Sequence, residues 1–382
     1  MSELPGGRSR SGVALRALLL AAGCVASGAR PAETLASAVA ACMNAARRLF
    51  DQDAQLRSYE RPTHDGARVY AYSPVELVNN CTVGMRVNAD YAVGKGIQGK
   101  AKVVVEFDVC LVRAQLASLR ALPMLYWNGS KPDLHLWRSA MIRHDGASRG
   151  GKSHGMLKGY RKGSDLALDL GFGRAGPKAA WQRYGKCAVV GGAPSLTRAS
   201  NGPLINSHDA VIRFNDHPAG GAYSKSAGAR STFRMFNSLY AEAPSTDPTA
   251  QVLQVCQNGK RVRGAIERAA ADGHDKRHML EPEVYRTFYE HFGSGGLTGA
   301  LGVWFALAMC DEVTLFGFSS PCELGAKYTH YHSETAYMER VQVNTVKVAL
   351  WTWALRCAGL VRWAPPLDGS DPDHQCAAVI AR

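Results

Sequence analysis

A strand, a glycine turn, a short helix and a second strand follow one another between residues 186 and 215, and this order constrains the fold most. The apolar run Cys187–Val190 is short and rich in β-branched residues, and it ends at Gly191-Gly192. We expect Ser195 to cap the helix that comes next, and Ala210–Phe214 to form the second strand. A strand that leads through a glycine turn into a helix N-terminus predicts a site for a phosphate-bearing ligand.

The rest of the C-terminal half repeats this alternation. We expect further strands at Ser231–Phe236, Gln251–Cys256 and Glu312–Phe318, and helices at Val262–Ala271, Pro282–His291 and Thr298–Met309. The alternation predicts an α/β fold with a mostly parallel central sheet and helices on both faces. Ligands bind at the carboxyl ends of such strands, so the Gly191 turn, Asn215 and Gly317 are expected to meet at one edge.

The N-terminal half is less regular. The apolar run Ala17–Ala29 follows several arginines and is short for a membrane-spanning helix, so it suits a signal-peptide core or a weak signal-anchor. Residues 30–60 are expected to be helical, and strands are expected at Val69–Tyr72 and Lys102–Val109. We therefore divide the chain into a targeting segment with a stem (1–60), a variable part with a Gly/Lys-rich linker (61–180) and an α/β domain (181–382).

The formal net charge is +13, but the basic residues are scattered and no nucleic-acid-binding motif is present. An anionic small substrate or an acidic membrane surface explains this charge equally well, so we expect no nucleic-acid partner. The ten cysteines include no CxxC pair, so no zinc site is expected, whereas an oxidising compartment would permit disulfides. Asn80 and Asn128 each begin a sequon for N-glycosylation.

Two other classes of nucleotide-binding protein are disfavoured. Gly146 and Gly151-Lys152-Ser153 satisfy the P-loop spacing, but the preceding Met141–Asp145 is largely polar and glycines interrupt the residues after Ser153, so a flexible linker is favoured over a nucleotide hydrolase. A dinucleotide oxidoreductase is disfavoured because the turn after Gly191-Gly192 lacks the third glycine of the dinucleotide fingerprint.

The chain resembles the eukaryotic-type sialyltransferases in several motifs that occur in the right order. The long sialyl motif of that family corresponds to Cys187–Gly191, Leu196, Ser207–Asp209, Arg213–Asn215, Pro218, Gly221–Tyr223 and Gly228–Ser231. The short motif corresponds to Thr298-Gly299 through Leu307, Cys310–Val313 and Phe316–Phe318. A third motif, histidine-tyrosine-aromatic, corresponds to His330-Tyr331-His332. The resemblance covers roughly residues 186–355.

This chain departs from the family at two places. The family usually has an asparagine or serine, which contacts the nucleotide, where this chain has Gly192. Its last motif, a histidine followed by a glutamate, is compressed here into the third motif, with Glu334 or Glu339 available to orient a base. These departures leave open a CMP-binding protein without transferase activity.

The resemblance implies a variant Rossmann-like (GT-A-like) glycosyltransferase that moves sialic acid from a CMP-sugar to a glycan hydroxyl with inversion. A related acidic sugar such as Kdo is the alternative donor. His332 is expected to act as general base and His330 to stabilise the departing phosphate, although these roles are exchangeable. CMP-sugar contacts are expected from the following residues: Gly191, Gly192, Ser195, Asn215, Thr298 and Gly299.

The resemblance further implies a disulfide between Cys187 and Cys310 and a single-pass type II protein of the Golgi membrane with its catalytic domain in the lumen. A cleaved N-terminus would make the protein secreted or organellar. No metal or other cofactor is expected, because neither Asp-x-Asp pair, Asp51-Gln52-Asp53 or Asp371-Pro372-Asp373, follows an apolar strand. Cys256, Cys322, Cys357 and Cys376 are further candidates for disulfides.

Overall fold

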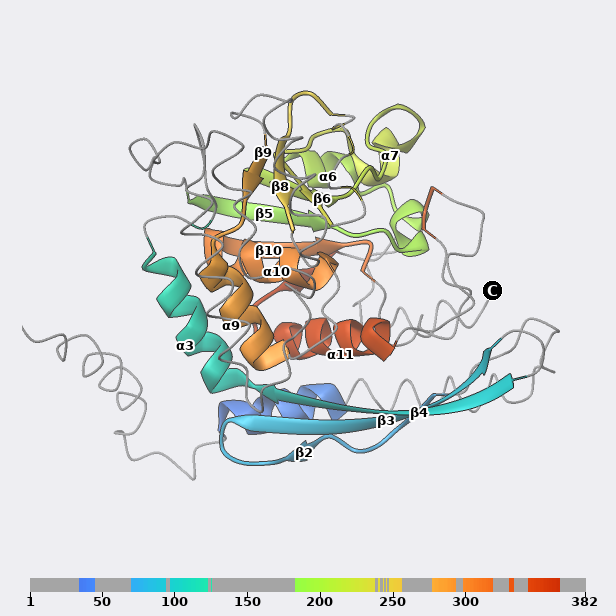
Figure 1. Ribbon diagram of the computed structural model, residues 1–382, viewed down its shortest axis with the longest axis vertical. Helices are drawn as coiled ribbons and strands as arrows, with labels where there is room; N and C mark the ends of the chain where they lie inside the picture. Colours follow the sequence, from blue (N-terminus) through green and yellow to red (C-terminus); the bar gives the residue numbers. More distant parts are fainter. Residues whose placement is uncertain are drawn as a thin grey trace, which may run out of the picture.

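The computed structural model shows an α/β body with a long β-hairpin beneath it (Figure 1). It describes residues 34–44, 70–93, 97–122, 125, 183–237, 240, 243, 245, 247–255, 277–292, 298–318, 330–332 and 343–364. The N-terminal apolar run, the P-loop match, the expected helix Val262–Ala271, Glu334, Glu339 and Asn128 lie outside these residues. Within the described part, no helix has the length and apolar character needed to cross a membrane.

A seven-stranded sheet forms the centre of the described body, in the order β11-β10-β5-β6-β7-β8-β9. Every neighbouring pair of these strands is parallel. The strands are β5 (Tyr184–Val190), β6 (Ala210–Phe214), β7 (Phe233–Phe236), β8 (Gln251–Gln254), β9 (Arg277–Met279), β10 (Cys310–Phe316) and β11 (Arg362–Trp363). The predicted α/β fold with a mostly parallel sheet is confirmed.

Helices cover both faces of this sheet, as predicted. On one face, Cys187, Val189 and Ile212 belong to the main core with α10 (Thr298–Met309), whose residues from Ala300 to Met309 are all buried. On the other face, Ala188 and Val211 belong to a smaller cluster with η1 (Pro194–Arg198), α6 (Gly202–Asn206) and α7 (Ser224–Ala227). Alternate residues of β5 and β6 thus face opposite layers, which explains why the runs Cys187–Val190 and Ala210–Ile212 are apolar throughout.

The outer helices extend the main core. Three further helices contribute buried side chains to it: α3 (Val109–Arg120), α9 (Pro282–Phe292) and α11 (Val343–Cys357). A helix at 35–44 contributes as well, and Thr34 accepts a hydrogen bond from the Ser37 amide at its start. The short η2 (Gly221–Tyr223) lies between β6 and α7 in the sequence.

An antiparallel sheet precedes the parallel one. It consists of β1 (Tyr70–Tyr72), β2 (Glu76–Leu77), β3 (Thr82–Val93) and β4 (Ile97–Asp108), and β3 and β4 pair along their full length. In Figure 1 this hairpin runs below α11. The predicted strand Lys102–Val109 coincides with the second half of β4. Its predicted end is one residue too far, because Val109 is the first residue of α3. Asp108 caps α3 by accepting a hydrogen bond from the Leu111 amide at 2.8 Å.

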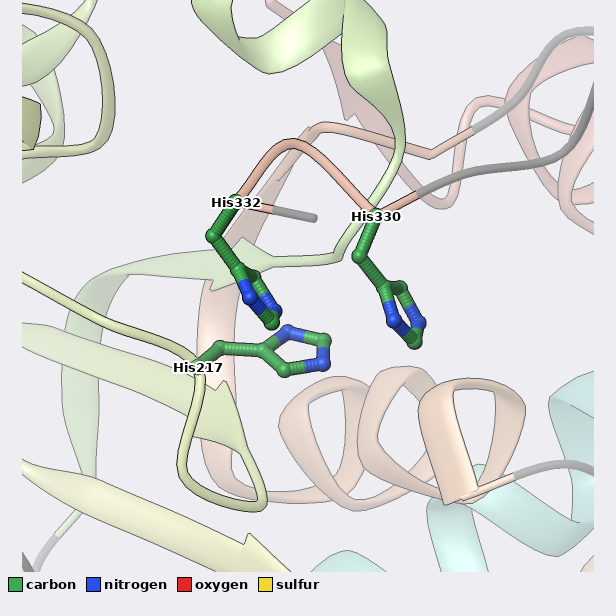
Figure 2. Close-up of side chains that lie close together, drawn as sticks. All are labelled: His217, His330 and His332. Atoms are coloured by element: carbon green, nitrogen blue, oxygen red, sulfur yellow. The ribbon is translucent and has the colours of Figure 1, made fainter. Parts of the chain in front are cut away.

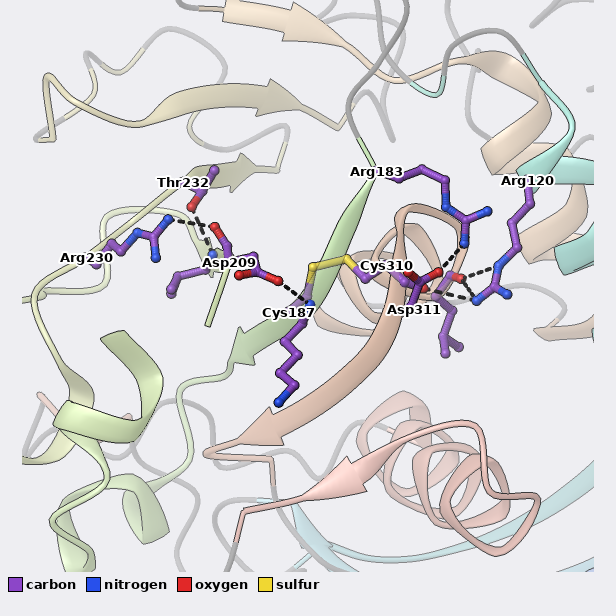
Figure 3. Close-up of a disulfide and its surroundings, with 11 residues drawn as sticks. Arg120, Arg183, Cys187, Asp209, Arg230, Thr232, Cys310 and Asp311 are labelled. Atoms are coloured by element: carbon purple, nitrogen blue, oxygen red, sulfur yellow. Dashed lines mark hydrogen bonds and ion pairs between the residues drawn. A yellow bond between two sulfur atoms is a disulfide. The ribbon is translucent and has the colours of Figure 1, made fainter. Parts of the chain in front are cut away.

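Three disulfides join the described residues: Cys42–Cys357, Cys81–Cys110 and Cys187–Cys310. The first links the N-terminal helix to α11 across 315 residues of sequence. Cys187–Cys310, implied by the resemblance, is confirmed; it joins β5 to the first residue of β10 with Cα atoms 6.1 Å apart (Figure 3). On either side of it, Asp209 accepts from the Lys186 amide and Arg120 donates to the Cys310 carbonyl. The disulfide therefore fixes the two central strands to each other.

Candidate active site

The strand order reverses between β5 and β10. From β5 the chain builds outward through β6, β7, β8 and β9, and then returns to place β10 and β11 on the opposite side of β5. In parallel α/β sheets, such a reversal leaves a crevice outside the carboxyl ends of the two central strands, where ligands bind. Gly191 follows β5 and Gly317 follows β10, so a glycine turn from each of the two predicted motifs lies at this edge.

Gly191 and Gly317 are in close contact at this edge. A Cβ atom on Gly191 would lie 2.4 Å from the Gly317 carbonyl oxygen, so only glycine fits. The amide of Gly191 donates to the Phe316 carbonyl at 2.7 Å, and that of Ala193 donates to Gly317 at 2.8 Å. These two amides are bonded within the protein, so the turn serves to bring the two motifs together and does not offer both as donors to a phosphate.

The prediction that Ser195 caps a helix is wrong. The segment after the turn is the five-residue 3₁₀ helix η1, its N-cap is Ala193 and no side chain caps it. Pro194 occupies the start of this helix, a position that tolerates proline because its amide would have no partner. Ser195 lies one residue further inside, half-buried. Its contact with a CMP-sugar stays a prediction.

Asn215 lies at the carboxyl end of β6 in a left-handed conformation with φ of 49°. Its side-chain oxygen accepts a hydrogen bond from the Asn237 amide at 3.1 Å, and its carbonyl accepts one from Arg234 at 3.1 Å. The side chain therefore ties the ends of β6 and β7 together. This structural role matches the ordinary use of asparagine in turns, and a ligand role stays a prediction.

Thr298 and Gly299 begin α10, as predicted. A Cβ atom on Gly299 would lie 3.5 Å from the Phe318 ring, and one on Gly191 would lie 3.2 Å from the same ring. Phe318 also makes an edge-on contact with Phe214, with ring centroids 6.4 Å apart. The Phe318 ring thus lies between the start of α10 and the Gly191 turn. A nucleotide-binding role for Thr298 and Gly299 stays a prediction.

The third motif lies directly over the turn. The amide of Tyr331 donates to the Gly192 carbonyl at 3.0 Å, and the Tyr331 hydroxyl donates to the Pro218 carbonyl. These two bonds hold the segment between β6 and the turn after β5. They place His330 and His332 at the switch point; the catalytic roles that the resemblance implies for these two histidines stay predictions.

A third histidine, His217, joins His330 and His332 (Figure 2). Its ring centroid lies 4.7 Å from that of His330 and 5.0 Å from that of His332. Sequence reasoning missed His217, although its place two residues after Asn215 puts it just past the carboxyl end of a strand. A Cβ atom on Gly192 would lie 2.6 Å from the His217 ring and 2.7 Å from the His330 ring. The histidines therefore occupy the room that a polar side chain at position 192 would need.

Burial keeps these histidines neutral. Desolvation lowers the pKa of His217 to about 3, and the nearby charges of His330 and His332 contribute in the same direction. Burial also lowers the pKa of His330 and of His332, while Asp216 acts in the opposite direction on both. At neutral pH the rings are therefore mostly uncharged, His217 most strongly so.

Two arginines, Arg213 and Arg234, lie near His217. Arg213 is 1% exposed, donates to the carbonyls of Ala227 and Arg230, and lowers the pKa of His217 together with Arg234. Arg234 donates to the His217 carbonyl at 2.9 Å and lies 3.6 Å from Asp247. The edge thus combines neutral bases with buried guanidinium groups, an environment that suits an anionic ligand.

The fold and this edge define a Rossmann-like α/β protein with three histidines at the topological switch point of its sheet. The profile of Glycosyltransferase family 29 (sialyltransferase) matches residues 172–265, which contain the Gly191 turn, Asn215 and His217. The resemblance to sialyltransferases predicted from the motifs is therefore confirmed.

Individual proteins are also similar to parts of this chain. Sialyltransferase-like protein 2 of Arabidopsis thaliana is 28% identical over 209 residues, 53% of this chain and 44% of the relative. CMP-N-acetylneuraminate-beta-galactosamide-alpha-2,3-sialyltransferase 2 of Mus musculus is 27% identical over 177 residues, 41% of this chain and 49% of the relative. A mammalian sialyltransferase crystal structure aligns with a TM-score of 0.43 and 18% identity over 65% of this chain and 91% of that one. The chain spans less than half the length of the two named relatives.

Proposed function

We propose that this protein is a glycosyltransferase that moves sialic acid, or a related acidic sugar, from a CMP-sugar to a glycan hydroxyl with inversion. The observation that carries the proposal is the position of His330 and His332, held over the Gly192 carbonyl at the switch point by the Tyr331 amide. The name of the mouse relative states a CMP-N-acetylneuraminate donor. Kdo, another acidic sugar, is the alternative donor, to be separated by comparing CMP release from the two.

In the proposed reaction, an acceptor hydroxyl attacks the anomeric carbon of the donor sugar. The new carbon–oxygen bond forms as the bond to the CMP phosphate breaks, and the leaving phosphate takes that electron pair. His332 takes the hydroxyl proton; its Nε2 is buried without a hydrogen-bond partner in the described part of the protein. His330 stabilises the departing phosphate, and the charges of Arg213 and Arg234 favour an anion at this edge.

No metal or other cofactor is part of this proposal, because the neutral histidines and the arginines supply the base and the positive charge. We also propose that the protein works in the Golgi lumen, with its N-terminal apolar run as signal-anchor. The three disulfides support an oxidising compartment. Asn80, exposed in a turn beside the disulfide-bonded Cys81, is a proposed glycosylation site, as is Asn128.

The test is CMP release from CMP-sialic acid in the presence of a panel of glycan acceptors. The wild type is compared with His332→Ala and His330→Ala, and with His291→Gln as a control for a histidine on α9, away from the site. Loss of the general base should lower kcat by roughly 10²–10⁴-fold in His332→Ala, whereas His291→Gln should retain activity. CMP binding without release by the wild type would instead indicate a CMP-binding protein without transferase activity.

A further inference from the structure

His217, His330 and His332 approach one another closely enough to act on one ligand. Each offers a ring nitrogen, and these nitrogens all lie within 4.8 Å of one another. The rings of His330 and His332 are stacked at an interplanar angle of 10°, and the His217 ring lies tilted against both (Figure 2). His217 is 8% exposed and the other two are half-buried, so a ligand among them would be largely shielded from water.

The chemistry of the cluster matches one class of ligand. Neutral imidazole is the common protein ligand for zinc and neighbouring transition metals, and three imidazole rings converge here. Within the described residues, Nδ1 of His217 and Nε2 of His332 are buried with no hydrogen-bond partner. Buried polar atoms without partners are uncommon, and a bound ion is one way to satisfy them.

We propose that His217, His330 and His332 form a binding site for one divalent transition-metal ion of the zinc class. A zinc–nitrogen distance of about 2.0–2.1 Å sets the ligand nitrogens about 3.3 Å apart in tetrahedral geometry. The cluster lies within 4.8 Å, so it must contract by at most about 1.5 Å. Rotation of the half-buried His330 and His332 side chains can supply this movement. Three histidines leave a fourth position open.

The charged groups around the cluster have opposite effects on the binding of a cation. Arg213 and Arg234 act on His217 as positive charges and disfavour a cation, whereas Asp216 acts on both His330 and His332 as a negative charge and favours one. Arg234 is itself partly compensated by Asp247 at 3.6 Å. Gly192 completes the site, because a side chain there would push the His217 and His330 rings aside.

A metal at this site would occupy the lone pair that the proposed general base needs. The consequence, which rests on the proposed function, is that zinc acts as an inhibitor and not as a cofactor. The metal site itself does not depend on transferase activity, because binding is measurable without donor or acceptor.

The experiment is a titration of the chelator-treated full chain with Co²⁺, followed by its visible absorption, and a competition with Zn²⁺. The wild type should bind one ion, and His217→Gln and His330→Gln should each lose more than about 100-fold in affinity, beyond what an outer-shell group contributes. Gly192→Ala should weaken binding as well. His291→Gln, which replaces a half-buried histidine outside the cluster, should bind as the wild type does. Urea unfolding of each variant establishes that it is folded.

Failure of the metal site and failure of the proposed function are distinguishable. The proposal is overturned if the folded wild type binds no Co²⁺ or Zn²⁺, or if both cluster variants bind as tightly as the wild type. CMP release measured in chelator reports on the transferase alone. If chelator-treated protein is active and stoichiometric Zn²⁺ leaves its rate unchanged, the inhibitory consequence is wrong.

Discussion

Gly192 offers a direct test of whether the histidine cluster lies in the catalytic machinery. A Cβ atom at this position would lie 2.6 Å from Cε1 of His217 and 2.7 Å from Cδ2 of His330, whereas ordinary contact begins near 3.4 Å. In Gly192→Ala the two rings must therefore move by about 0.8 Å and about 0.7 Å. Both obstacles are side chains, so we expect the rings to shift and the fold to survive.

The expected consequence is catalytic. A displacement of about 1 Å of a group in a reacting constellation lowers the rate by about 10²-fold. We expect kcat for CMP release to fall by about this factor in Gly192→Ala, with a smaller change in KM for the donor. The measurement is steady-state kinetics in chelator, together with urea unfolding of the same preparation.

Gly359→Ala is the matched control. Gly359 follows α11 with φ of +70°, and a Cβ atom there meets nothing within 4 Å. This variant should lose about 1 kcal/mol of stability because alanine disfavours the left-handed conformation, and its kinetics should not change. If folded Gly192→Ala keeps kcat within about twofold of the wild type, the displaced His330 ring does not act on the reacting atoms and its proposed role fails; the role of His332, which the added Cβ does not meet, is tested by His332→Ala.

Three further predictions concern pKa values and a covalent link. The pKa of His332 is lowered, so kcat/KM should rise with pH and reach half its plateau below pH 6.5; a midpoint above that value in the pH–rate profile contradicts the assignment. The folded-state pKa of His291, about 4, lies below its ordinary 6.5, so its contribution to stability is complete above pH 6.5 and is lost on acidification. Urea unfolding should show about 2 kcal/mol less loss between about pH 7 and pH 5 in His291→Gln than in the wild type, and equal losses would refute this. Replacing Cys187 and Cys310 by alanine removes a link across 123 residues and should lower the free energy of unfolding by about 4 kcal/mol; an unchanged urea midpoint would refute this.

Where the sequence pattern was local, it predicted the structure well. Ala210–Phe214 and Thr298–Met309 have the predicted bounds, because almost every residue in this buried strand and this buried helix is apolar. The strand β3 was missed, although apolar Val83, Met85 and Val87 alternate with Gly84, Arg86 and Asn88; what this alternation does not show is the full-length pairing with β4. Long antiparallel pairing depends on the partner strand, which a local pattern does not contain.

In the candidate site, too, residue type was predicted from the local sequence, whereas the role of the side chain depended on a neighbouring segment. Ser195 has the residue type of a helix cap, but Pro194 and the short η1 moved the cap position to Ala193. Asn215 has the residue type of a ligand contact, but its side-chain oxygen is bonded to the Asn237 amide at the end of β7. In both cases a neighbouring segment determined what the side chain does.

By itself, the sequence determined the alternation of strands and helices, the two glycine turns and the pairing of Cys187 with Cys310 that the family resemblance implied. Only the tertiary structure decided that the strand order reverses between β5 and β10, and that His217 meets His330 and His332 there. His217 and His330 are 113 residues apart in the sequence, and a local pattern of apolar and polar residues cannot predict a contact over that separation. Gly192, a departure from the family when read alone, has a physical reason in the folded protein: two histidine rings fill its space.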